Sequence, residues 1–231
     1  MNLLKGYFLP DLRDVCMKKL FVIVLMVVAG LMAVGCNRVV ADGAEEVGPL
    51  PENTRMVNLA WKPTLRTDEL DLEPLTFYKN VTISLQSIMD VRQDPRIIGS
   101  TFNDLKVRTA TIPIATRENV AKWCKNAFEN TCREITITTG KKGKLRLEVE
   151  ITEFSISDDY TQTGTASLRV NAFTDDEMLI WEGRIKGTSD LYVHGTDSDG
   201  ISECLSNTMM VTLHNVFTDR SFRDAVGKSI E

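Results

Sequence analysis

The stretch from Met17 to Cys36 most constrains what this chain can fold into, because it is not expected to belong to the folded part. Lys18 and Lys19 follow the methionine, an apolar run extends from Leu20 to Val34, and small residues precede the cysteine. A cationic start, a short hydrophobic segment and a small-residue cleavage site are the layout of a bacterial signal peptide. We therefore expect the fold to be built from the residues after this stretch.

The cysteine at the end of the stretch predicts a lipid anchor. Ala33-Val34-Gly35-Cys36 resembles a lipobox, although Ala33 stands where leucine is usual. Signal peptidase would cleave between Gly35 and Cys36 after the cysteine has received a diacylglycerol. Two alternatives stay open. One is an uncleaved anchor, which would be short because a membrane-spanning helix needs about 20 apolar residues. The other is an ordinary secretory signal in which Cys36 is incidental.

Four segments follow from this interpretation. Residues 1–16 carry two aspartates and a proline ahead of a normal signal start. We interpret them as an upstream extension before a true initiator at Met17, with a genuine cytoplasmic extension as the alternative. Residues 17–35 are the signal peptide. Residues 36–55 contain Gly, Pro and Glu with little apolar periodicity, which predicts a flexible tether. Residues 56–231 are expected to form a single domain.

The net charge narrows the class of partner. Lys and Arg total 27 against 32 for Asp and Glu, a formal charge of −5. An acidic domain repels nucleic acid and anionic lipid headgroups, so we expect no nucleic-acid partner and a membrane contact made through acyl chains. Asn37 and Arg38 place no aspartate after the lipidated cysteine. If the host follows the lipoprotein retention rule of enteric bacteria, the absence of this aspartate predicts that the protein is sorted to the outer membrane, where it faces the periplasm.

Alternation of apolar and polar residues predicts the strands. Four clear patterns are Val81–Leu85, Leu145–Ile156 with a bulge near Thr152-Glu153, Ala166–Ala172 and Leu179–Ile185. Met56–Trp61 and Leu105–Ile114 would raise the number of strands to six. Thr174 to Glu177 separates the last two clear patterns and predicts a hairpin turn.

Helical spacing of apolar residues appears twice. The first expected helix runs from Arg117 to about Asn130 with Thr116 as its N-cap, and the second from about Ile201 to Phe217. A Gly, Ser and Asp-rich loop, residues 187–200, should precede the second helix. The expected fold is therefore α+β, a mainly antiparallel sheet of about four to six strands with two helices packed on one face.

A charged turn after the first clear strand is the candidate recognition patch. It contains Asp90, Arg92, Asp94 and Arg96 in alternation. The alternative is a solvated turn whose ion pairs each contribute up to about 1 kcal/mol.

No constellation for catalysis, metal binding or a cofactor is visible. His194 and His214 stand apart from other ligand-type residues at metal-binding spacing. Asp197-Ser198-Asp199-Gly200 is similar to the start of a calcium loop, but its glycine comes too early and Thr208 occupies the position of the last glutamate. We interpret Asp199 as a helix N-cap. The chain is therefore not expected to be an enzyme.

The cysteines after the anchor are Cys124, Cys132 and Cys204. If the two expected helices lie antiparallel on the sheet, the end of the first meets the start of the second. This arrangement would allow a Cys132–Cys204 disulfide. The alternative is three reduced, partly buried thiols.

The order of these elements resembles a known family. A lipoprotein signal, a strand ending in Asp90-x-Arg92, a helix, strands containing Trp181-x-Gly183 and a closing amphipathic helix are similar to the YajG-like lipoproteins. They also resemble the auxiliary lipoproteins of ABC-type envelope transporters. The resemblance covers about Val81 to Asp224. It implies a small α+β outer-membrane lipoprotein without known catalysis.

Two functions are consistent with these observations. The first is a non-enzymatic, lipid-anchored envelope protein that acts as a binding or adaptor subunit for transport, assembly or cell-wall machinery. The second is a periplasmic carrier that shelters a lipid in an apolar cavity between sheet and helices. A packed core would favour the first, and a sizeable apolar cavity the second.

Overall fold

Three long strands follow directly from the alternation of apolar and polar residues. In the computed structural model they are β5 (Leu145–Asp158), β6 (Gln162–Thr174) and β7 (Leu179–Leu191). They pair antiparallel, with Val149 of β5 opposite Val170 of β6. The register of β5 shifts between Ile151 and Glu153, which confirms the bulge expected near Thr152-Glu153. The structure describes residues 48–102, 110–159, 161–192 and 198–230.

The strand β7 is longer than its composition suggests. Gly187 to Leu191 was expected to begin a loop, but these residues continue the ladder, and Leu191 pairs with Gln162 at the start of β6. The expectation is wrong because a long partner strand fixes backbone that local composition would leave irregular. Residues 193–197 of the expected loop lie outside the described residues.

The other half of the sheet pairs differently. It contains β2 (Ile83–Asp90), β3 (Ile97–Phe102), β4 (Thr111–Thr116) and β1 (Arg55–Val57). Both β2 and β3 run parallel to β5 along the same side of it, one after the other. β4 pairs antiparallel with β3, and β1 pairs parallel with β4. Within the described residues this makes a seven-stranded sheet of order β1-β4-β3-β5-β6-β7, with β2 also beside β5.

The α+β class is confirmed, but the sheet is mixed rather than mainly antiparallel and has more strands than expected. The helix α2 (Val120–Glu134) connects β4 to β5. A strand that returns after a helical crossover can run parallel to the strands before it. Alternation predicts that a segment is a strand, but it does not give the direction of the partner strand.

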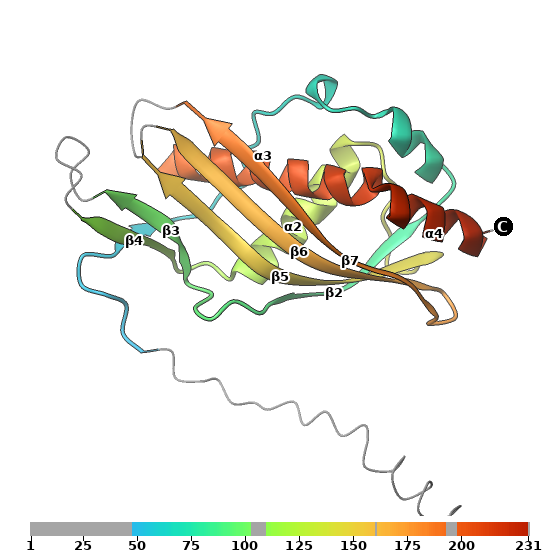
Figure 1. The fold of residues 1–231 in the computed structure, drawn as a ribbon, viewed down its shortest axis with the longest axis horizontal. Coiled ribbons are helices and arrows are strands. Elements are labelled where there is room, and N and C mark those ends of the chain that lie inside the picture. The colour runs from blue at the N-terminus through green and yellow to red at the C-terminus, as the bar shows by residue number, and fades with distance from the viewer. Residues whose placement is uncertain (1–47, 103–109, 160, 193–197, 231) are drawn as a thin grey trace, which may run out of the picture. The chain divides into compact units, whose positions relative to one another are not determined.

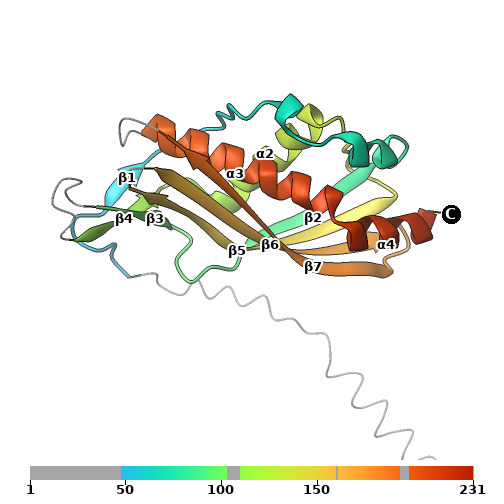
Figure 2. The ribbon, with the colours of Figure 1, turned by 45° about the horizontal axis from the view of Figure 1, so that its top comes forward.

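Two helices cover one face of the sheet, as expected. They are α2 and α3 (Ser198–Thr218), which pack against each other (Figure 1, Figure 2). A further helix, α4 (Arg220–Ile230), was not expected and packs against β7. Asp219 starts α4 by accepting a hydrogen bond from the Phe222 amide at 2.9 Å. Phe222 and Val226 are buried one turn apart, so the helix is held by an apolar stripe.

The segment after β1 lies on α3 instead of continuing as a strand. Polar side chains of α3 accept hydrogen bonds from its backbone: Ser202 Oγ from the Ala60 amide at 3.1 Å and Ser206 Oγ from the Lys62 amide at 3.0 Å. Asn207 Oδ1 accepts from the Thr64 amide at 2.9 Å. The strand expected over Met56–Trp61 therefore ends at Val57, because helix side chains satisfy the backbone groups that a neighbouring strand would satisfy.

Aromatic side chains fill the space between the sheet and its helices. Trp123 of α2 contacts Phe154 of β5 at a centroid distance of 5.4 Å, and Phe128 contacts Phe217 of α3 at 6.3 Å. Tyr78 packs on Phe217 at 5.6 Å and donates its hydroxyl to the Phe217 carbonyl at 3.0 Å. These side chains are buried, so the layer between sheet and helices is a packed core.

Candidate binding site

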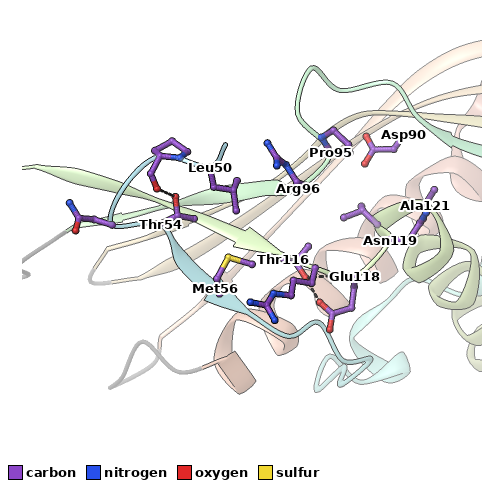
Figure 3. Close-up of a pocket in the computed structure, with 14 residues that line it drawn as sticks. Leu50, Thr54, Met56, Asp90, Pro95, Arg96, Thr116, Glu118, Asn119 and Ala121 are labelled. Carbon is purple, nitrogen blue, oxygen red and sulfur yellow. Dashed lines mark hydrogen bonds between the residues drawn. The ribbon is translucent and has the colours of Figure 1, made fainter. Parts of the chain in front are cut away.

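An open cavity of ≈ 920 Å³ lies where three segments meet (Figure 3). The segments are residues 50–56, the turn after β2, and the residues that lead into α2. Its lining combines apolar and charged side chains: Leu50, Pro51, Met56, Asp90, Arg96, Arg117 and Glu118, with Asn53, Thr54, Pro95, Thr116, Asn119, Val120 and Ala121. Such a mixed lining can contact a protein, because protein interfaces combine apolar area with a polar rim.

The N-terminus of α2 forms one wall of the cavity. The N-cap is Asn119, whose side-chain oxygen accepts a hydrogen bond from the Lys122 amide at 2.8 Å. The expected N-cap, Thr116, is wrong because this residue belongs to β4. Its hydroxyl instead accepts a hydrogen bond from the Glu118 amide at 3.2 Å and donates to the Glu118 carboxylate (Figure 3). The helix therefore begins three residues later than the sequence pattern predicts.

The Glu118 carboxylate is held in its ionised form. Burial by itself raises its pKa, but hydrogen bonds from the Thr116 hydroxyl and from backbone amides outweigh this effect and leave the pKa below its usual value. Arg117 beside it is exposed. The α2 wall therefore presents a fixed negative charge next to an exposed positive one.

Residues 49–55 were expected to belong to the tether, but they are part of the compact unit that begins at Pro49. The Thr54 amide and hydroxyl donate to the Pro51 carbonyl at 3.2 and 2.6 Å, and Asn53 adopts a φ of 70°. Arg55 Nη1 pairs with the buried Asp158 carboxylate at 3.3 Å. The Pro, Asn and Thr spacing is a turn signal that the sequence interpretation missed.

Two residues of the expected recognition patch, Asp94 and Arg96, form an ion pair beside the cavity, and only Arg96 is part of the lining. Arg96 Nη2 lies 2.9 Å from Asp94 Oδ2, and the two side chains are 33% and 27% exposed. The hydrogen bond from Arg96 is the main reason that the pKa of Asp94 is lowered. Arg96 lines the cavity directly.

The other two residues of the patch are structural. Arg92 and Asp90 form a pair at 2.6 Å whose side chains are only 9% and 8% exposed. Arg92 also donates to the carbonyls of Pro95, Ile97 and Phe154, each at 2.8 Å. Its guanidinium therefore fills the gap on β5 between the end of β2 and the start of β3. Of this pair only Asp90 reaches the cavity lining.

The three cysteines are buried free thiols, which is the reduced alternative, and the possible Cys132–Cys204 disulfide is not formed. Burial raises the pKa of Cys124, Cys132 and Cys204, that of Cys204 to about 12. Cys204 Sγ also lies 3.4 Å from the Gln162 carbonyl. These thiols behave as small core residues.

The helix directions explain why the bridge is absent. Trp123, early in α2, contacts Trp61, which lies in the segment held by the first half of α3. Phe128, further along α2, contacts Phe217 at the end of α3. The two helices therefore run in the same general sense, and the expected antiparallel arrangement is wrong. The end of α2 and the start of α3 are consequently not neighbours.

The remaining candidates have structural partners or lie outside the described residues. His214 Nε2 lies 2.8 Å from the Asp71 carbonyl. Asp199 lies within the first turn of α3, which begins at Ser198, and its carboxylate pairs with Lys62 Nζ at 2.6 Å. His194 and Asp197 fall in a gap of the described residues. In the described ranges, no group of three or more His, Cys, Asp or Glu side chains could hold a metal ion.

The anchor residues Gly35 and Cys36 also lie outside the described residues, so lipidation stays a prediction. None of the helices within residues 48–230 that the structure describes is long and apolar enough to span a bilayer.

Comparison with known proteins gives structural likeness only. No family model and no curated protein matches the chain. A Xanthomonas campestris protein of the family DUF330 is 10% identical, with a TM-score of 0.40 over 76% of this chain and 94% of that one. PelC from Paraburkholderia phytofirmans, crystallised as a dodecamer, is 10% identical, with a TM-score of 0.37 over 61% and 88%. Lipoprotein GNA1162 from Neisseria meningitidis is 10% identical, with a TM-score of 0.24 over 50% of this chain and 87% of that one. Likeness at this level assigns neither family nor function, and the resemblance to YajG-like lipoproteins stays a prediction.

Proposed function

We propose that this protein is a non-enzymatic, lipid-anchored component of the bacterial cell envelope that binds a protein partner as an adaptor subunit. The anchor is Cys36 at the end of the lipobox-like motif, and the expected membrane is the outer one. The partner belongs to transport, assembly or cell-wall machinery. The binding surface is the cavity at the N-terminus of α2.

The packed layer between sheet and helices is the observation that carries this proposal. A lipid carrier needs an enclosed apolar space there, typically of several hundred Å³. In this chain four buried rings occupy that layer and contact in two pairs, Trp123 with Phe154 and Phe128 with Phe217. The adaptor function is therefore favoured over the carrier function.

The position of the cavity supports partner binding. It is open, it is lined by the first residues of the compact unit, and Met56 is 40% exposed within its lining. Methionine adapts its shape to different contacts, and an exposed arginine such as Arg117 is enriched at interfaces. A partner would find an apolar contact, an exposed cation and a fixed carboxylate side by side.

Site-specific photocrosslinking in cells tests the proposal. A photoreactive residue in place of Met56 should yield one discrete adduct with an envelope protein, and Arg117→Glu should remove it. The matched control is the same residue in place of Tyr192, which is 86% exposed and outside the cavity. Equal labelling from both positions would show that the cavity has no specific partner. A stoichiometric lipid found by native mass spectrometry of the purified protein would instead favour the carrier.

A further inference from the structure

The outer edge of β2 is occupied at one end and open at the other. The Ile83 amide donates to the Thr138 carbonyl at 2.9 Å, and the Ile83 carbonyl accepts from the Gly140 amide at 2.9 Å. These two hydrogen bonds form a parallel bridge between Ile83 and Thr139. Beyond that bridge, β2 pairs as a strand with β5 alone within the described residues. Leu85 to Asp90 therefore keep an open strand edge, which is a template for another strand.

A groove runs along this open edge. One cavity of ≈ 280 Å³ lies between Leu85–Ile88 of β2 and residues Ala121, Lys122 and Lys125 of α2. A second cavity of ≈ 510 Å³ shares Leu85 and Lys125 with the first and continues past the end of α2 to Lys141. Since α2 packs on β2 and the cavities share lining residues, they form one groove, whose walls are the strand edge and an exposed flank of the helix.

The charge of the groove is opposite to that of the whole protein. Four cationic side chains, Lys122, Lys125, Arg133 and Lys141, line its two cavities, against the single carboxylate of Glu129. The chain as a whole carries −5. Among the described residues, none of the three lysines forms an ion pair, so their charges are available to a ligand. The half-buried Leu85 and Ile88 add apolar contact on the strand side.

We propose that the β2 edge takes up an extended, acidic segment of a partner protein as an added strand. Main-chain hydrogen bonds to Leu85–Asp90 would hold its backbone. These bonds would lie on the same edge of β2 on which Thr138–Gly140 already pair with Ile83. Alternate side chains of a strand point to opposite sides. One set, the carboxylates, would face α2, where Lys122 and Lys125 line the same cavity as Leu85 and Ile88, and the other set would point away from the helix. The inference rests on the proposed adaptor function and names the chemistry of the partner segment.

Binding of a synthetic peptide tests this. The probe is a fluorescein-labelled peptide in which glutamate alternates with valine or threonine, followed by fluorescence anisotropy. The double variant Lys122→Glu with Lys125→Glu should weaken binding about tenfold or more and should accept the same peptide with lysine in place of glutamate. The matched control is Arg184→Glu with Lys186→Glu on the exposed side of β7, which makes the same charge change elsewhere and should leave binding unchanged.

Two further measurements distinguish strand pairing from simple charge attraction. Hydrogen exchange should show new protection of the Leu85–Asp90 amides on peptide binding. A peptide N-methylated at alternate residues on its pairing edge should not bind. No binding, equal weakening by the β7 control, or binding by the N-methylated peptide would overturn the proposal. Self-association that the Lys122→Glu/Lys125→Glu variant abolishes would assign the edge to a second copy and also overturn it.

The outcome is separable from that of the proposed function. If the Met56 crosslink to a partner survives the Lys122→Glu/Lys125→Glu variant and the peptide does not bind, the adaptor function stands and the strand-addition site fails. If the peptide binds as expected but no Met56-specific adduct forms, the groove stands and the cavity is not the partner surface.

Discussion

At the scale of single residues, Arg92 is the side chain whose role differs most from its sequence interpretation. Its neighbours in the turn are charged, which suggested a solvent-facing patch. In the fold, the bulge in β5 and the break between β2 and β3 leave backbone carbonyls without strand partners. A planar guanidinium with five N–H donors can reach several of them at once, whereas an ammonium group cannot do so in the same geometry.

Replacing Arg92 by alanine should destabilise the protein by about 3–5 kcal/mol, because it removes the cation that pairs with the buried Asp90 carboxylate and the donor to three carbonyls. Arg92→Lys should recover little of this loss. Urea unfolding followed by circular dichroism measures the change. The control is Arg66→Ala, which removes an exposed pair with Asp68 and should cost less than about 1 kcal/mol. Equal costs for the two alanine variants would contradict the structural role of Arg92.

The buried thiols lead to a prediction about reactivity and pH. Native protein should resist maleimide labelling at Cys124, Cys132 and Cys204, while the same protein in denaturant should label at all three. Because burial raises their pKa in the folded state, their contribution to stability is present below the ordinary thiol pKa of 9.0 and is lost as the pH rises above it, for Cys204 through about 12. A Cys132–Cys204 peptide in a non-reducing map would contradict this prediction.

At the scale of elements, the close approach of α3 to the sheet depends on a glycine in β7. A Cβ added to Gly187 would lie 2.7 Å from both the Cα and the amide nitrogen of Thr212, which are backbone atoms of α3 and cannot rotate away. Gly227 in α4 is different, because an added Cβ would meet only Phe77 at 3.7 Å, an ordinary van der Waals contact.

These two glycines predict opposite responses to the same substitution. Gly187→Ala should destabilise by about 1–3 kcal/mol, since α3 must move away from the sheet. Gly227→Ala should stabilise by about 0.5–1 kcal/mol, because alanine loses less conformational freedom in a helix. Thermal unfolding of the two variants measures both effects. Changes of the same sign would mean that the packing of one of these helices is different from that described.

At the scale of the whole molecule, the proposed anchor would decide where the proposed binding surfaces operate. If the Cys36 thiol is the acceptor of the diacylglycerol, as we propose, Cys36→Ala should abolish labelling by a clickable palmitate analogue and should release or stall the precursor. In-gel fluorescence measures the label, and Cys204→Ala is the matched control that should keep it. Unchanged labelling of Cys36→Ala would contradict lipidation. Density-gradient fractionation that finds the protein wholly in the inner membrane would contradict the expected sorting.

What the sequence alone determined is what local periodicity encodes: the long strands β5 and β6, the bulge near Thr152-Glu153, the two helices on one face and the α+β class. Each depends on contacts between residues close in the chain or on one buried face, so spacing reveals it. The signal-like stretch before Cys36 is local in the same sense.

Only the tertiary structure decided the features that depend on which distant segments meet. Four such features arise from partners far away in the chain. They are the parallel pairing of β2 and β3 with β5, the extension of β7, the hold of Ser202 and Ser206 on the segment after β1, and the burial of Arg92. The candidate cavity brings residues 50–56 together with the ends of β2 and β4 and the start of α2. The spacing of residues in the sequence does not predict such long-range contacts, because they are stabilised by desolvation and hydrogen bonding that exist only once the chain has folded.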